Sequence, residues 1–245
     1  MRRTLLTLVV GLCFLATAQA QNYAKKLKKA TGITVTYRSV YKGKPRPGGV
    51  MMSVCGDQVK LQNLSPEGKI VEPKANTLRQ DTYIDYSRRL SYRRAVMPNN
   101  AVVYTNAPFE YGEGFTDVKT EKYLGLNCKV VRTIVNSNTI DVWYTNDIAL
   151  RGTPQTWRGV PDGLVLRVVR NGDSVQEAVG IKALKDKSPL LPSDWGHYLD
   201  SSNYTYAVNQ SGVISVPVFD QQTICFNGAK LPEKLEDGKV YVAAG

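Results

Sequence analysis

The amino-acid sequence predicts a mainly β fold, an antiparallel sheet accompanied by one or two short helices. Three observations predict this class. Apolar and polar residues alternate in many short segments, as they do in half-buried strands. Residues that favour tight turns separate these segments, and almost no stretch has helical periodicity. Since tight turns join strands that are neighbours in sequence, we expect an antiparallel meander rather than a parallel sheet.

Residues 1–20 have the composition of a signal peptide. Basic residues come first, followed by the apolar run 5–16 and by Ala18-Gln19-Ala20, a small-x-small cleavage site. The run is shorter than the ~20 apolar residues that a membrane-spanning helix needs. We therefore expect an exported protein, periplasmic or secreted, whose first mature residue is Gln21. The alternative is a retained N-terminal anchor.

The first half of the mature chain begins with a short, lysine-rich helical turn at 25–29. Ile33, Val35 and Tyr37 then alternate with polar residues and predict the first strand. A loop rich in Gly and Pro follows. Beyond this loop, three segments have strand character: 50–61, 81–96 (one long strand or a hairpin) and 101–104.

Two hairpins are expected in the second half, because Asn and Gly accept the positive backbone angles of tight turns. Their strands are 129–134 with 139–145 around Asn136-Ser137-Asn138, and 164–170 with 175–184 around Asn171-Gly172-Asp173.

The composition changes after residue 184. We expect residues 21–184 to form the antiparallel β domain, and 185–245 to be a polar loop followed by further strands of the same domain. The last apolar segment, 239–243, stands at the end of the chain, where polar residues are more usual. It indicates either a centrally paired strand or the front part of a longer protein.

The chain carries 32 basic and 21 acidic residues, a formal charge of +11. Loss of Arg2 and Arg3 with the signal peptide would lower this to +9. A basic surface attracts polyanions, and export leaves acidic lipids or amphiphiles and a peripheral membrane contact as candidates, with no nucleic acid. The alternative is a solvated basic surface without a dedicated partner.

Three cysteines would remain in the mature chain: Cys55, Cys128 and Cys225. An oxidising compartment favours pairing, so we expect at most one disulfide, with the pair unassigned. The alternative is buried thiols. No Cys-x-x-Cys motif is present and His197 is the only histidine, so no metal site is expected.

No catalytic residue is predicted. The sequence has no Gly-x-Ser-x-Gly nucleophile motif that His197 could activate, and a lone histidine in a loop is more often structural. A hydrolase could use two carboxylates, but acids are too common here for spacing to select a pair. The sequence likewise indicates no cofactor.

Residues 123–172 carry the strongest family signal. Gly125-Leu126-Asn127-Cys128 precedes Val142-Trp143-Tyr144-Thr145, and Gly159-Val160-Pro161-Asp162-Gly163-Leu164 follows. This block resembles the GLPGLI family of secreted bacterial envelope proteins and its relatives with the lipoprotein-carrier (LolA-like) fold. Asp162, between the proline and the glycine, departs from the strict signature.

The resemblance implies a curved sheet, an incomplete barrel, around an apolar hollow that shields acyl chains. Its walls would come from residues of the signature block, although aromatic residues there suit core packing equally well. The candidate ligand-binding residues are Val142, Trp143, Tyr144, Trp157, Leu164 and Leu166.

The densest charge cluster is the segment 88–94. On a strand, Arg88, Tyr92 and Arg94 would share one face and could bind an anionic group through forked hydrogen bonds. The alternative is an edge strand whose charges discourage aggregation.

These observations favour an exported, non-catalytic envelope protein that binds a lipid or a lipidated partner, its oligomeric state left open. The first alternative is an N-terminal accessory domain of a larger secreted enzyme that processes glycoproteins or glycans. The second is a hydrolase with an unrecognised carboxylate site.

Overall fold

The structure is a computed structural model. It describes residues 27–72, 79–96, 102–108, 114–155, 161–184, 188–195, 197–198, 207–208, 213–218 and 222–227. The expected signal peptide, Trp157 and the segment 239–243 lie outside the described residues.

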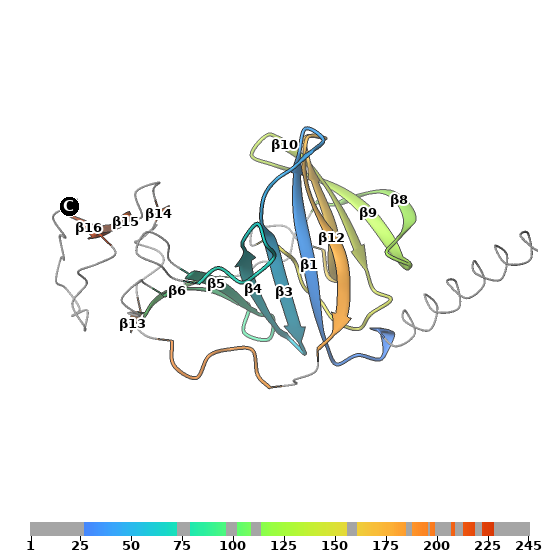
Figure 1. The fold of residues 1–245 in the computed structure, drawn as a ribbon. Helices are drawn as coiled ribbons and strands as arrows, with labels where there is room; N and C mark the ends of the chain where they lie inside the picture. The colour runs from blue at the N-terminus through green and yellow to red at the C-terminus, as the bar shows by residue number, and fades with distance from the viewer. Residues whose placement is uncertain are drawn as a thin grey trace, which may run out of the picture.

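A large open sheet forms the body of the domain (Figure 1). Its strands are β1 (Gly32–Tyr41), β2 (Lys44–Pro45), β3 (Gly49–Cys55), β4 (Gln58–Leu64), β5 (Arg79–Asp85), β6 (Leu90–Val96), β7 (Val102–Pro108), β8 (Thr116–Tyr123), β9 (Leu126–Val135), β10 (Asn138–Thr145), β11 (Leu164–Arg170), β12 (Ser174–Ala183) and β13 (His197–Tyr198). Their order is β13-β7-β6-β5-β4-β3-β1-β12-β11-β10-β9-β8, with β2 paired to β1. A separate three-stranded sheet contains β14 (Ala207–Val208), β15 (Val213–Val218) and β16 (Gln222–Asn227).

The predicted fold class is confirmed. All neighbours in the large sheet are antiparallel except β13 and β7, and the sheet ends in two different edge strands instead of closing. Within the described part of the chain, helix is confined to a single turn at 27–28, so the expected short helices are represented only by the end of 25–29.

Strand β1 joins the two halves of the sheet. It pairs with β3 on one side and with β12 on the other, and β12 lies far from β1 in the sequence (Figure 1). Its predicted alternation holds, because Ile33, Val35 and Tyr37 are all buried. The hydroxyl of Tyr37 donates a hydrogen bond to the carbonyl oxygen of Val165 in β11.

Both predicted hairpins of the second half are present. Asn171 and Gly172 have φ of 52° and 75°, and Asn136 and Ser137 have φ of 46° and 62°. These are the left-handed angles that make such turns favourable.

One strand prediction is wrong, one pair of alternatives is decided, and one strand was missed. The segment 50–61 is two strands, since Gly56 adopts φ of 56° and turns the chain between β3 and β4. Of the two alternatives for 81–96, the hairpin is present, and its turn contains Arg89 at φ of 55°. Strand β8 was not predicted, because its side chains are almost all exposed and give no alternating pattern.

The predicted ligand-binding residues that the structure describes lie in two hydrophobic clusters. Trp143, Leu164 and Leu166 belong to the main hydrophobic core, while Val142 and Tyr144 belong to a smaller cluster. On β10, Trp143 faces one side of the sheet and its neighbours Val142 and Tyr144 face the other, as the alternation of a strand requires. The predicted ligand-binding residues that the structure describes therefore hold the domain together.

One prediction concerns Gly49, where β3 passes close to β1. A Cβ at this position would overlap the Tyr37 carbonyl oxygen. We expect Gly49→Ala to lower the free energy of unfolding by about 1–3 kcal/mol, since this backbone contact has no room to relax. Gly180→Ala on β12 is the control, because nothing lies within 4 Å of its Cβ. Equal urea midpoints for the two variants would contradict the prediction.

Candidate functional site

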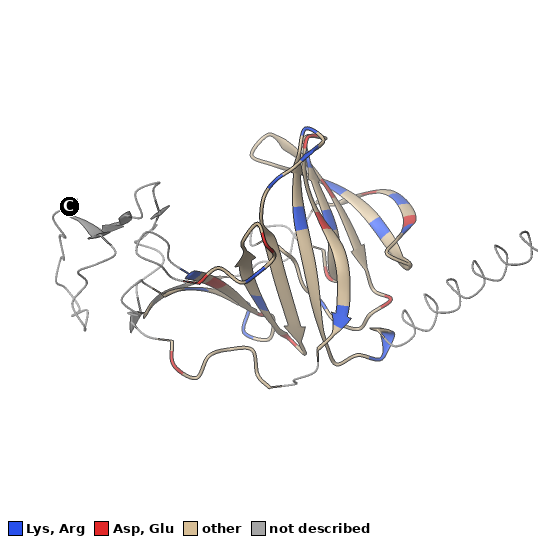
Figure 2. Ribbon diagram, viewed as in Figure 1, with Lys and Arg blue, Asp and Glu red and all other residues tan. Residues whose placement is uncertain are grey.

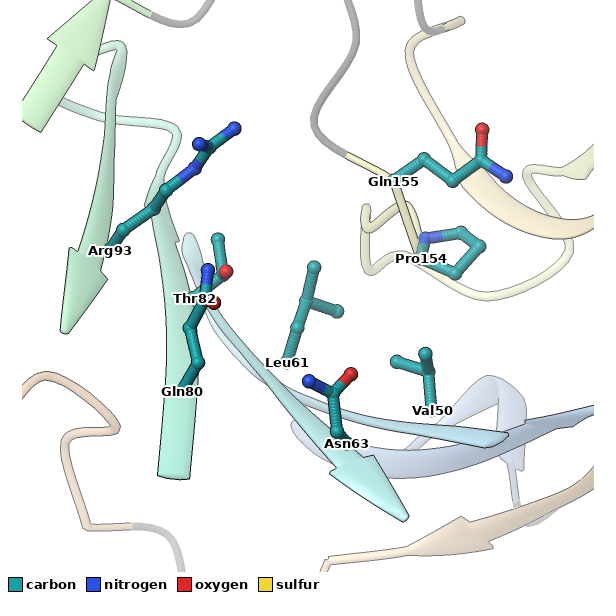
Figure 3. Close-up of a pocket in the computed structure, with 8 residues that line it drawn as sticks. All are labelled: Val50, Leu61, Asn63, Gln80, Thr82, Arg93, Pro154 and Gln155. Carbon is teal, nitrogen blue, oxygen red and sulfur yellow. The ribbon is translucent and has the colours of Figure 1, made fainter. Parts of the chain in front are cut away.

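A polar hollow lies where β4, β5 and β6 face the loop residues 154–155 (Figure 3). Its volume is about 480 Å³, within the ~300–1,000 Å³ range of small-ligand sites. We call it the β4–β6 hollow. It is lined by Val50, Leu61, Asn63, Gln80, Thr82, Arg93, Pro154 and Gln155.

Strand pairing brings these residues together. Leu61 pairs with Thr82, and Thr82 pairs with Arg93, so the three side chains form a row across three strands. Asn63 and Gln80 lie two residues from this row and share its face, because side chains alternate along a strand. Figure 3 shows this group on one side of the hollow and Gln155 on the other.

Most polar side chains of the β4–β6 hollow are not engaged elsewhere. No hydrogen bond or ion pair joins the side chains of Asn63, Gln80, Thr82 or Arg93 to another residue that the structure describes. Gln155 differs, since its Nε2 donates to Oε1 of Gln176 at 2.7 Å. The free groups include amides, a hydroxyl and a guanidinium, so they can donate and accept hydrogen bonds to a ligand.

The residues that line the hollow supply no acid–base chemistry. None of the described lining residues is an acid, a histidine or a cysteine, so none of them can act as the general base that the Thr82 hydroxyl would need to become a nucleophile. No group of three or more potential metal ligands occurs among the described residues. The arrangement is suited to binding.

The opposite face of the same strands carries a buried carboxylate, Asp81. Its oxygens accept hydrogen bonds from Gln62 Nε2 at 3.3 Å and from the Tyr83 hydroxyl at 3.4 Å. Arg79 Nε lies 3.4 Å away and Lys60 Nζ 3.9 Å away. Burial, together with the charge of Asp81, raises the pKa of Tyr83 to about 12. Asp81 is thus a buried carboxylate whose hydrogen bonds and charge are balanced within the sheet.

Trp195 packs on this opposite face. Its ring stacks on Tyr92 with centroids 4.6 Å apart and lies 5.2 Å from Tyr83 and 5.5 Å from Tyr104. The backbone amide of Leu190 donates to Oε1 of Gln58, which holds the preceding residues against the start of β4. The sequence places Trp195 in a polar loop and gives no signal for these contacts, which depend on tyrosines from three strands.

The expected anion site of Arg88, Tyr92 and Arg94 is not assembled. Arg88 lies in the turn before β6, is 68% exposed and pairs with Asp85 at 3.6 Å. Tyr92 is buried under Trp195. Arg94 lies beside Asp81 in the strand register. All three residues belong to the charged segment 88–94, but Arg88 lies in the turn, whereas Tyr92 and Arg94 lie in β6.

The cysteine and charge predictions can also be placed. Cys128 is a buried thiol in β9, and burial raises its pKa to about 11, which suppresses its reactivity. Cys55 lies at the end of β3, and the side chain of Cys225 is outside the described residues.

Basic and acidic residues are interspersed along the strands (Figure 2). Within the described residues, no helix has the length and apolar character needed to cross a membrane.

Together these features define a β domain with a large open sheet and a polar hollow on one face. Residues 35–206 match the family described as "N-glycanase peptide, N-terminal domain". The match covers well over half of the sequence, and the chain belongs to this family. No curated protein matches it significantly.

Solved structures of PNGF-II resemble the domain in two crystal forms. The form in space group P21 has 29% identity and a TM-score of 0.58 and covers 72% of this chain and 35% of that chain. The C2 form has 26% identity and the same TM-score and covers 76% and 40%. The chain therefore spans two fifths or less of the length of these relatives.

The family match corrects the resemblance to GLPGLI and lipoprotein-carrier proteins, which is wrong. The quoted motifs cover only a short part of the chain, whereas the match extends over most of the sheet. The sheltered acyl-chain site was implied by that resemblance and loses its support.

Proposed function

We propose that this chain is the N-terminal domain of an exported N-glycanase and contributes to substrate recognition rather than to bond cleavage. The match of residues 35–206 to the N-terminal domain of that family carries the proposal. The small share of the PNGF-II chains that the sequence spans supports it, since those chains have ample length for a further domain. The signal-peptide pattern of residues 1–20 accords with export.

The chemistry of the β4–β6 hollow is consistent with this division of labour. Its amides, hydroxyl and guanidinium match the hydroxyl groups of carbohydrate, which both donate and accept hydrogen bonds. Its described lining contains no carboxylate pair of the kind that a glycoside hydrolase uses.

The test compares the 245-residue chain with the same chain fused to the remainder of PNGF-II. Each is incubated with an N-glycosylated model protein, and released glycans are measured by mass spectrometry. We expect release by the fusion and none by the chain alone. Release by the chain alone would overturn the accessory role, and an inactive fusion would count against an N-glycanase partnership.

A further inference from the structure

Arg93 is an arginine without an acidic partner in the described structure. Two other arginines of the β5–β6 hairpin are paired: Arg79 contacts Glu72 at 3.3 Å and Asp81 at 3.4 Å, and Arg88 contacts Asp85. Arg93 is exposed and extends into the β4–β6 hollow, where no lining residue is acidic (Figure 3). The described lining of the hollow therefore carries one uncompensated positive charge.

The alternation of β5 explains why this charge stays uncompensated. Asp81, the nearest acid along the strand, points to the opposite face, while Gln80 and Thr82 point into the hollow with Arg93. The sheet itself keeps the carboxylate away from the guanidinium. A ligand that supplies a negative charge would complete the pairing, and a guanidinium binds such groups through two parallel hydrogen bonds.

The rest of the lining specifies what surrounds that negative charge. Asn63, Gln80 and Thr82 offer neutral donors and acceptors with no partner among the described residues. Val50 and Leu61 provide an apolar floor beneath them. Hydroxyl groups alternating with C–H surfaces fit this mixture, and a purely apolar chain would leave the polar groups unsatisfied.

We propose that the β4–β6 hollow binds an acidic sugar, with its carboxylate or sulfate group paired to Arg93 and its hydroxyls bonded to Asn63, Gln80 and Thr82. The proposal rests on the proposed function and specifies the substrate class as glycans that contain an acidic sugar. The hollow selects the substrate without contacting the bond that is cleaved.

The experiment is a calorimetric titration of the full chain with three probes: sialyllactose, lactose sulfate and unmodified lactose. We expect both acidic sugars to bind about five- to tenfold more tightly than lactose, with the preference weakening as salt is raised. The ratio between the two acidic probes distinguishes a carboxylate from a sulfate ligand.

Variants assign the effect to named residues. Arg93→Gln should abolish the preference for acidic sugars, and Thr82→Val should weaken the binding of all three probes. Arg89→Asn is the matched control, since it removes the same charge from the turn of the same hairpin, and asparagine tolerates the positive φ there. Urea midpoints verify that each variant is folded.

Three results would overturn the inference: no binding of any probe, equal affinity for all three, or an equal loss with Arg93→Gln and Arg89→Asn. None of these depends on glycan release, so the inference and the proposed N-glycanase partnership can fail separately.

Discussion

Replacing Trp143 with alanine should lower the free energy of unfolding by about 3–5 kcal/mol. The indole is only 7% exposed and packs in the main core. Its Nε1 donates to Glu121 on β8, and the Arg167 guanidinium lies 4.9 Å from its ring. Truncation would leave a cavity and remove a contact that ties the edge strand to the sheet.

Chemical denaturation of Trp143→Ala and Trp195→Ala gives the measurement and its comparison. Trp195 stacks on tyrosines but is only half-buried, so we expect its loss to cost about 1–2 kcal/mol. The loss of stability from Trp195→Ala is thus larger than expected for an exposed loop residue, yet smaller than the loss from Trp143→Ala. A larger loss for Trp195→Ala would contradict the assignment of Trp143 to the core.

Replacing Asp81 with alanine should cost about 2–3 kcal/mol. The side chain is 1% exposed, and its removal deprives Arg79, Lys60 and the Tyr83 hydroxyl of a shared partner. The cost falls below the ~3–5 kcal/mol of a fully buried pair, because both cations reach solvent.

The isosteric Asp81→Asn separates charge from hydrogen bonding. It keeps the shape of the side chain and one acceptor oxygen, so we expect a smaller loss of stability than with alanine. Asp173→Ala, in the exposed turn before β12, is the control and should change the free energy of unfolding by less than about 0.5 kcal/mol. Equal urea midpoints for Asp81→Ala and Asp173→Ala would refute the structural role of Asp81.

Local chemistry made much of the fold predictable. The Asn171-Gly172 turn and the alternation of Ile33, Val35 and Tyr37 each depend on residues close together in sequence. The turn at Gly56 was missed although the buried apolar positions change there from Met52 and Val54 to Val59 and Leu61, a shift that breaks the alternation of a single strand. Strand β8 escaped prediction because an exposed edge needs no alternation.

The hollow was not predictable from local patterns. Its residues come from four strands and one loop, and Leu61, Thr82 and Arg93 meet only through the strand register. Each of them taken alone is an ordinary strand residue. The aromatic residues around 142–144 stand out in the sequence because large apolar side chains are typical of a hydrophobic core.

The pairing of β1 with β12 has a consequence for how the protein is made. Ile33 lies opposite Ala183, so roughly 150 residues must be synthesised before the strand at the middle of the sheet obtains its second neighbour. At the usual rates of translation this takes roughly 8–30 s. Pairings of such high contact order form slowly, and until they form, an apolar strand has an unpaired row of backbone groups. The central strand of the finished sheet is therefore the exposed edge of the nascent one.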